Sequence, residues 1–289
     1  MRNIAIHGIN ISEESIPLVD ALVNRLLKEK SEVAVSKRLK SQSLDCLSSF
    51  PTFEKGDNLK GFEMILSLGG DGTLLDTLTY VGSAEVPIMG INLGRLGFLA
   101  SISQDDLDSA LTNYFNGEFE LDKRTLLELN SDVPGFQKTN FALNECAILR
   151  KDSSSMIVVR CYLNNEYLNT YWADGLMVST PTGSTGYSLS CGGPVIMPQT
   201  KNFIITPVSP HNLNVRPLIV SEDSELIFEI ETRDQSFLVS MDSRSEAMKS
   251  GAMITVRKAP FSANLVKVKG ISFLDTLRGK LTWGLDRRN

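Results

Sequence analysis

Three glycines and one carboxylate stand together at Gly69-Gly70-Asp71-Gly72-Thr73, directly after the apolar run MILSL at 64–68 and at the start of a helical pattern. Glycines let a backbone approach a ligand closely, and the amides at a helix N-terminus attract phosphate oxygens. Asp71 would repel phosphate unless it takes a proton from an attacking hydroxyl or helps to hold magnesium. The alternative is a simple strand-to-helix turn capped by Asp71. The three glycines favour a phosphoryl-transfer site for an unspecified substrate.

A second glycine-containing loop, NLGRLGFL at 92–99, follows the apolar run IMGIN at 88–92. Ligands of α/β proteins bind where the carboxyl ends of parallel strands meet, so we expect this loop beside Asp71. Arg95 is a candidate phosphate contact. An ordinary strand–helix connection with an exposed arginine is equally compatible with these residues.

A long run rich in hydroxyls and glycines extends from Asp174 to Pro194, with the sequence DGLMVSTPTGSTGYSLSCGGP. Serine and threonine can bond ribose hydroxyls and base edges, glycines admit planar groups, and Tyr187 can stack or form a hydrogen bond. A flexible linker is the alternative, but linkers rarely contain Tyr, Leu and Pro at this density. We therefore interpret the run as part of a binding cleft.

The pair Asn144-Glu145 interrupts a strand pattern that is otherwise apolar, with FAL before it and CAIL after it. Buried polar side chains cost free energy unless they find partners. The pair therefore either hydrogen-bonds a neighbouring strand or loop, or it faces a ligand cleft. The sequence leaves both interpretations open.

Strands alternate with helices in the first part of the chain, which predicts a parallel sheet with helices on its faces. The strands are predicted at 3–8, 32–35, 64–68 and 88–92. Segments 15–29 and 101–115 have apolar residues at helical spacing. Ser103 is expected to cap the second of these helices, and Asn116-Gly117 to end it.

From about residue 119 the helical spacing gives way to short runs of β-branched and aromatic residues separated by turn residues. We therefore expect an N-terminal Rossmann-like α/β domain over 1–118 and a C-terminal antiparallel β-sandwich domain over 119–269. A helical pattern returns at 270–284. It favours packing of 270–289 back onto the first domain.

The composition excludes several classes of protein. Hydrophobic residues make up 42% and charged residues 22%, no apolar run reaches the ~20 residues of a membrane helix, and the N-terminus lacks a secretory pattern. A net charge of −5 gives no support to a nucleic-acid partner. Four scattered cysteines and two histidines disfavour zinc and indicate reduced thiols, so we expect a cytoplasmic protein.

The four stretches, in the order GGDGT, NLGRLGFL, NE and DGLMVSTPTGSTGYSLSCGGP, closely resemble the NAD kinase family, and the similarity covers most of the chain. GGDGT is shared more widely, with diacylglycerol and sphingosine kinases, whereas the last stretch is far more specific. The closing FLDTLRGKLTWG also looks like the family's C-terminal segment. The resemblance implies transfer of the γ-phosphoryl group of ATP to the 2′-hydroxyl of the adenosine ribose of NAD.

Family roles carry over to matching positions. Asp71 is then the catalytic base, with Gly72 against the substrate. Asn144 and Glu145 bind the adenosine part of NAD, and Asp174 holds the nicotinamide end. The cleft is lined by Thr185, Gly186, Tyr187, Ser188, Leu189 and Ser190. The resemblance further implies a divalent cation, usually magnesium, with residues unspecified, and a homodimer or homotetramer whose neighbouring subunit completes the cleft.

The chain departs from the family at several positions. Members often have alanine at Gly186, and many have basic residues near Ser155 and Trp172, so no phosphate contact is carried over to those two. Arg244 is an alternative candidate for one. Asp76 adds a negative charge near the expected phosphates, which only an orientation away from them explains.

Two rival functions differ in what they require of the chain. A diacylglycerol-type lipid kinase shares the GGDG site but needs an apolar acceptor channel, whereas Thr180–Ser190 suits a polar acceptor. A non-catalytic NAD or NADP sensor has no need of Asp71 beside a phosphate site. Both rivals are therefore less favoured than an NAD kinase.

Overall fold

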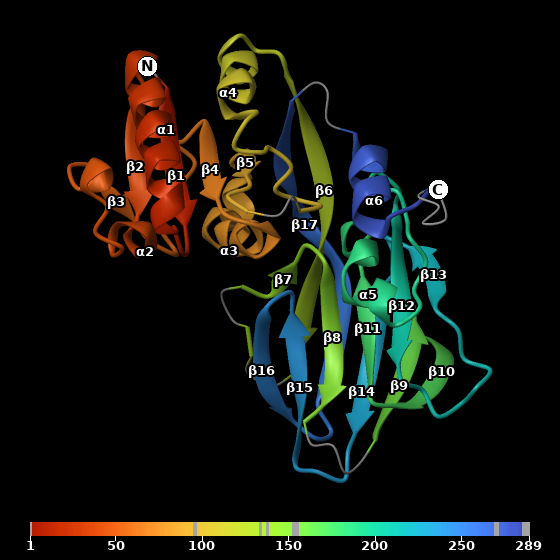
Figure 1. Cartoon of the computed structure of the whole chain (residues 1–289). Helices are drawn as coiled ribbons and strands as arrows, with labels where there is room; N and C mark the ends of the chain where they lie inside the picture. Colours follow the sequence, from red (N-terminus) through yellow and green to blue (C-terminus); the bar gives the residue numbers. More distant parts are fainter. Residues whose placement is uncertain are drawn as a thin grey trace. The chain divides into compact units, whose positions relative to one another are not determined.

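The computed structural model describes residues 2–94, 97–132, 135–136, 139–151, 156–268 and 272–284. The chain divides into two compact units (Figure 1), Met1–Lys123 with Ala263–Asn289, and Arg124–Ser262. Two long strands, β6 (Phe119–Ser131) and β17 (Met253–Val268), continue from one unit into the other. No helix of the described residues is long and apolar enough to span a membrane.

The first unit contains a parallel sheet in the order β5-β4-β1-β2-β3, and the last part of β17 joins it beside β5 through Leu265 and Ile88. Its strands are β1 (Asn3–Gly8), β2 (Glu32–Ser36), β3 (Thr52–Phe53), β4 (Met64–Leu68) and β5 (Ile88–Ile91). Its helices are α1 (Ile16–Lys28), α2 (Lys37–Lys40), α3 (Asp71–Val81), α4 (Leu107–Phe115) and α6 (Phe273–Leu281), with 3-10 turns η1 (Glu13–Ser15), η2 (Asp45–Leu47) and η3 (Gly82–Ala84).

The helical spacing predicted for 15–29 has a direct structural cause in α1. Val19, Leu22, Val23 and Leu26 form one buried face of this helix. They pack in one cluster with Ile4 and Ile6 of β1 and with Met64 and Leu66 of β4. Burial of this face stabilises the sheet whose carboxyl edge carries the GGDGT loop.

The second unit is a sandwich of antiparallel strands. One sheet has the order β10-β9-β14-β17, and the other β13-β12-β11-β8-β15-β16; β6 pairs with β17 and β7. The strands are β7 (Phe141–Ala142), β8 (Glu145–Arg150), β9 (Ile157–Leu163), β10 (Glu166–Ala173), β11 (Gly175–Ser179), β12 (Asn202–Val208), β13 (Leu218–Ser221), β14 (Leu226–Glu231), β15 (Ser236–Met241) and β16 (Arg244–Lys249). The short η4 (Thr182–Thr185) and α5 (Tyr187–Ser190) follow β11.

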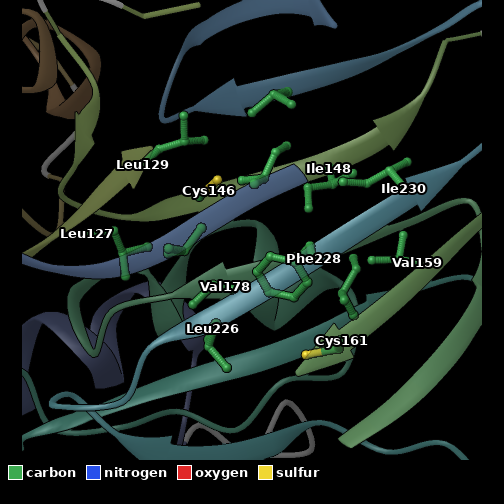
Figure 2. Packing of buried hydrophobic residues seen from close by; sticks show 14 of the residues in the cluster. Leu127, Leu129, Cys146, Ile148, Val159, Cys161, Val178, Leu226, Phe228 and Ile230 are labelled. Atoms are coloured by element: carbon green, nitrogen blue, oxygen red, sulfur yellow. The ribbon is translucent and has the colours of Figure 1, made fainter. Parts of the chain in front are cut away.

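Side chains from both sheets fill the core of this second unit. Phe228 and Cys161 come from one sheet, and Val178 from the other, and all three are buried in one cluster (Figure 2). The two central positions of the turn between β9 and β10, Asn164 and Asn165, both have positive φ, as a two-residue hairpin turn requires. The predicted α/β plus antiparallel-β fold is confirmed.

Three local predictions were wrong. Helix α4 begins at Leu107, and Ser103 does not cap it: its hydroxyl bonds Asp106, while Ile102 pairs with Ile91 as an isolated bridge. The strand pattern of 166–180 (EYLNTYWADGLMVST) predicts one continuous strand, whereas the structure has two strands in different sheets, broken at Asp174. Asn144 precedes β8 instead of lying within it.

Candidate active site

The carboxylate of Asp71 lies at the start of α3 and accepts three backbone hydrogen bonds. Phe98 N–H donates to Oδ2 at 2.8 Å, and the N–H groups of Leu99 and Ala100 donate to Oδ1 at 3.0 Å each. The expectation that the 92–99 loop lies beside the GGDGT loop is therefore confirmed. Three donors from consecutive residues fix the orientation of the carboxylate, and they leave Oδ2 with one hydrogen bond where Oδ1 has two.

The loop that holds Asp71 is itself fastened to the end of β5. Asn92 accepts from Gly94 N–H at 2.7 Å through its side-chain oxygen, and its backbone N–H donates to Ile102 O at 2.7 Å. Gly97 then passes so close to Asp71 that a Cβ at Gly97 would lie 1.9 Å from Oδ1. The second glycine of NLGRLG is therefore required by a close approach to the aspartate.

The glycines of GGDGT have different roles. Gly69 has φ +149°, and a Cβ there would lie 2.3 Å from Thr73 Oγ1. Gly70 and Gly72 are exposed, and a Cβ on either would meet nothing within 4 Å. Steric demand explains Gly69, whereas the open backbone at Gly70 and Gly72 is what close approach of a ligand requires.

The negative charge of Asp76 is neutralised by basic partners inside the first unit. Its carboxylate receives Lys55 Nζ at 2.8 Å, Arg38 Nη1 at 3.1 Å and His7 Nε2 at 3.1 Å. Burial raises the pKa of Asp76, but the hydrogen bonds from His7 and Lys55 and the charge of Lys55 outweigh it and hold that pKa well below its usual range. The Asp76 carboxylate therefore orients the side chains of Lys55 and Arg38. Their positive charges offset its negative charge, so it does not repel phosphate.

Asn144 and Glu145 belong to the second unit, and the turn residue Asp242 holds their backbone. The Asp242 carboxylate accepts from Leu143 N–H at 3.0 Å, Asn144 N–H at 2.7 Å and Glu145 N–H at 3.3 Å. The Glu145 side chain differs from this pattern, because its Oε2 is buried and has no hydrogen-bond partner. The backbone of Asn144 and Glu145 thus hydrogen-bonds a neighbouring turn, which is the first of the two interpretations. The unpartnered Glu145 oxygen fits the second, a ligand cleft.

Burial, and then the negative charge of Asp242, raise the pKa of Glu145 to about 8. The ordinary pKa of glutamate in an unfolded chain is about 4.3, so the folded state binds this proton more tightly. The stabilisation that results is fully present below about pH 4.3 and is lost as the pH rises through about 8.

Replacing Glu145 by glutamine removes this titration. We expect E145Q to gain stability relative to the unsubstituted chain as the pH rises from 5 to 9, by at most about 1.4 kcal/mol per pH unit. Urea denaturation at several pH values measures the difference, with the exposed Glu246→Gln as the control. If the stability difference between E145Q and the unsubstituted chain did not change from pH 5 to 9, Glu145 would already be ionised at the start of this range.

The hydroxyl-rich run after β11 folds against the Asn144–Glu145 backbone. Thr180 N–H donates to Asn144 O at 2.9 Å, and Thr180 Oγ1 donates to Leu143 O at 2.5 Å. A Cβ at Gly183 would lie 2.1 Å from Asn144 O, so only glycine fits there. Arg124 is buried, and its Nη1 donates to Thr182 Oγ1 at 3.1 Å, which stabilises the turn after β11.

The six residues predicted to line the cleft differ in exposure. Tyr187 and Ser190 are exposed, and Thr185, Gly186 and Leu189 are partly exposed. Ser188 is buried, and its hydroxyl bonds Thr206 Oγ1 at 2.8 Å, so its side chain packs against β12. A Cβ at Gly186 would lie 3.3 Å from Glu145 Oε2. Glycine at this position therefore leaves more room around the Glu145 carboxyl group than alanine would.

Asp174 occupies the connection between the two sheets of the second unit. Its N–H donates to Val208 O at 3.0 Å, its carbonyl accepts from Arg150 N–H at 2.9 Å, and its carboxylate pairs with Arg150 Nη2 at 3.1 Å. Glu145 pairs with Ser179 at the other end of β11. At about 3.3 Å per residue, the backbone positions of Asp174 and Ser179 lie roughly 16 Å apart along the strand.

The positions discussed as phosphate contacts in the sequence do not lie in the described site. Arg95 and Ser155 lie outside the described residues. Arg244 donates to the carbonyls of Thr139 and Phe141 and stacks on the Phe141 ring, so its guanidinium serves the fold. Asp71 and Gly72 belong to the first unit and the other predicted site residues to the second. Asp242, Arg124 and Arg150 were not predicted from the sequence. Asp242 has a positive φ, which is typical of an aspartate in a tight turn.

Comparison with known proteins identifies the chain's relatives. The ATP-NAD kinase N-terminal domain matches residues 4–119, and the ATP-NAD kinase C-terminal domain matches residues 143–268. The NAD kinase of Cytophaga hutchinsonii is 48% identical over 289 residues, which cover 99% of each chain. The chain belongs to the NAD kinase family. The NAD kinase of Flavobacterium psychrophilum is 42% identical, again over 99% of each chain.

Solved structures agree with this assignment. An NAD kinase from Archaeoglobus fulgidus in complex with ATP matches with a TM-score of 0.76 and 25% identity, over 97% of this chain and 98% of that one. Yeast NADH kinase complexed with NADH has a TM-score of 0.85 over 99% of this chain and 89% of that one, and at 21% identity it shows the fold. The predicted family, phosphotransferase class and NAD kinase function are confirmed, and a lipid kinase is not favoured.

Proposed function

We propose that this NAD kinase uses Asp71 as the base that activates the 2′-hydroxyl of the adenosine ribose of NAD. The observation that carries the proposal is the carboxylate held by three consecutive amides at the start of α3. A carboxylate so oriented can accept a hydroxyl proton at Oδ2, while the hydroxyl oxygen forms a bond to the γ-phosphorus and the bond to ADP breaks.

A coupled assay tests the function as a whole. The purified chain is incubated with NAD and ATP, and NADP is measured with a dehydrogenase that accepts only NADP. Polyphosphate in place of ATP, and NADH in place of NAD, define the donor and acceptor. Formation of labelled phosphatidate from a diacylglycerol, or binding of NADP with no turnover, would instead support the lipid kinase or the sensor.

A divalent cation fits the donor side of this chemistry. No group of three or more metal-binding side chains occurs among the residues that the structure describes. Mg²⁺ usually keeps several waters and binds through one or two carboxylates together with substrate phosphates, so the phosphates of ATP would provide most of its ligands. The ion neutralises charge on the transferred group.

The two ends of β11 are assigned to the two halves of NAD. Glu145, with its orphaned buried oxygen, and Asn144 bind the adenosine half, and Asp174 binds the nicotinamide half. The separation of roughly 16 Å along β11 between the backbone positions of Asp174 and Ser179, the partner of Glu145, supports their assignment to different parts of the dinucleotide.

Replacing Asp174 by alanine is expected to raise KM for NAD about tenfold while kcat changes little, because a binding contact is lost and the reacting atoms are untouched. Steady-state kinetics at saturating ATP measure both constants. The matched control is Glu229→Ala, an exposed acid elsewhere in the same unit. A fall in kcat with an unchanged KM would contradict the binding role.

The chain acts as a homo-oligomer in the cytoplasm. Apolar side chains are exposed on the edge strand β13, at Leu218 and Ile219, and in the preceding segment at Leu213. Such an edge is suited to pairing with a second copy. The four free thiols fit a reducing compartment. Light scattering of the purified chain measures the subunit number, and Ile219→Lys should lower it.

A further inference from the structure

The three residues whose amides hold Asp71 differ in how firmly they are themselves anchored. Leu99 and Ala100, which donate to Oδ1, are buried, so the surrounding core fixes their side chains. Phe98, which donates to Oδ2, is only partly buried. Its amide follows Gly97, and a glycine restrains the adjoining peptide plane less than any other residue does. The hydrogen bond to Oδ2 therefore depends on what the Phe98 ring contacts.

The Phe98 ring lies against the ring of Phe273, the first residue of α6. The two ring centroids are 6.3 Å apart and the ring planes are inclined by 46°, within the range in which aromatic pairs attract each other. Both residues belong to the first unit, as does Asp71. The C-terminal helix thus contacts the one residue that donates to Oδ2 among the residues that the structure describes.

Helix α6 holds Phe273 in a defined position. Ser272 caps the helix: its Oγ accepts from Leu274 N–H at 3.2 Å, and its carbonyl accepts from Thr276 N–H at 3.2 Å and from Thr276 Oγ1 at 3.3 Å. Thr276 and Leu277 are buried, and they follow Phe273 by three and four residues, a spacing that shares one face of a helix. Phe273 therefore lies on the face of α6 that packs against the protein, whereas Leu274 is exposed.

We infer that Phe273 is a positioning residue for the phosphoryl transfer. Its ring holds the Phe98 peptide so that the N–H points at Asp71 Oδ2, and this bond orients the oxygen that receives the ribose proton. The inference rests on the proposed function, since Asp71 is the base there. Phe273 acts through Phe98 and makes no contact of its own with Asp71, so its loss should lower kcat and leave the binding of NAD nearly unchanged.

Exchange of the Phe98 amide proton tests the contact without any turnover. In a chain labelled with ¹⁵N-phenylalanine, Phe98 gives one of 13 amide signals, identified by its absence in Phe98→Leu. Phe273→Ala should speed this exchange by about 2- to 13-fold, the factor that an aromatic pair contributes. Leu274→Ala, at the next position of α6, should leave it unchanged. Equal exchange rates in F273A and the unsubstituted chain would overturn the inference.

Steady-state kinetics provide the second test. F273A should lower kcat by about the same 2- to 13-fold, while KM for NAD changes less than about twofold. Phe273→Tyr, which keeps the ring, should recover most of the lost turnover, and Phe273→Leu, which keeps only an apolar side chain, should not. F273L replaces F273A in every comparison if the alanine chain does not fold. A raised KM with an unchanged kcat would contradict the positioning role.

The double variant F273A/D71N separates this inference from the proposed function. Once Asp71 is asparagine, adding F273A should lower kcat much less than it does alone, because both changes act on the same carboxylate oxygen. Additive losses would overturn the role of Phe273. If D71N lost its turnover while F273A behaved like L274A, only the inference about Phe273 would fail. If D71N kept its turnover, the proposed function itself would fail, whatever the amide exchange of Phe98 showed.

Discussion

Replacing Asp71 by asparagine is expected to lower kcat by about 10²- to 10⁴-fold, the usual contribution of a general base. Asparagine has nearly the same shape, and its carbonyl oxygen can keep the bonds from Leu99 and Ala100 N–H. Its amide nitrogen cannot accept the ribose proton. The affinity for NAD, measured by equilibrium binding without ATP, should stay within a few-fold of the unsubstituted chain.

The stability of D71N must be measured as a control, because the substitution also affects the fold of the 97–100 loop. The asparagine NH₂ group meets Phe98 N–H where a carboxylate oxygen accepted it, which costs roughly 1–3 kcal/mol of stability if the loop does not adjust. Thermal unfolding of D71N separates this loss from the loss of turnover. If D71N kept kcat within about threefold of the unsubstituted chain, Asp71 could not be the base.

Replacing Gly97 by alanine is expected to lower kcat at least tenfold, although residue 97 carries no chemistry. The new methyl group would lie 1.9 Å from Asp71 Oδ1 and 2.4 Å from its carboxyl carbon, so either the carboxylate or the loop must move. A displacement of about 1 Å at a reacting group can cost 10²-fold in rate.

Gly94→Ala is the matched control for Gly97→Ala. A Cβ at Gly94 meets nothing within 4 Å, and that glycine belongs to the same loop. G94A should therefore have kcat near that of the unsubstituted chain. Once Asp71 is asparagine, adding G97A should lower kcat much less than it does alone, because both changes act on the same group. Additive losses in the double variant would contradict the coupling.

The parallel sheet and its functional edge could be predicted because their determinants are local. The run MILSL, the glycines after it and the helical spacing from Leu74 onward define a strand, a turn and a helix within one short stretch. The proximity of the 92–99 loop to Asp71 followed from one topological rule, that neighbouring parallel strands end at the same edge. No pattern specified that three consecutive amides of that loop would bind the carboxylate.

Non-local contacts explain what the sequence could not supply. Asp174 breaks the run 166–180 because strands β10 and β11 pair with different partners, and no local spacing records a change of sheet. Strand β12 contains Pro207, which has no N–H to donate and is unusual in a central strand, so the local pattern there is a poor guide to the strand. Asp242 supports Asn144 from 98 residues away in the chain, a separation at which single-sequence patterns are silent.

Two positions at which this chain departs from its family have neighbours that the sequence alone does not reveal. Asp76 was unexplained as an isolated negative charge, and it became intelligible only with Lys55, Arg38 and His7 around it. Trp172 was noted for the charge it lacks, and its exposed indole lines a pocket together with Arg150. In both cases the meaning of a residue depends on neighbours brought together by the fold.

The most direct measurement is a single-turnover transfer of label from γ-labelled ATP, with the unsubstituted chain and D71N compared at equal NAD occupancy. The unsubstituted chain should place the label on the 2′-oxygen of NAD, 2′-deoxy-NAD should remain unlabelled, and D71N should transfer label about 10²- to 10⁴-fold more slowly. Transfer to an acceptor that lacks the 2′-hydroxyl, or an unchanged rate in D71N, would contradict the account of Asp71 as the base of an NAD 2′-kinase.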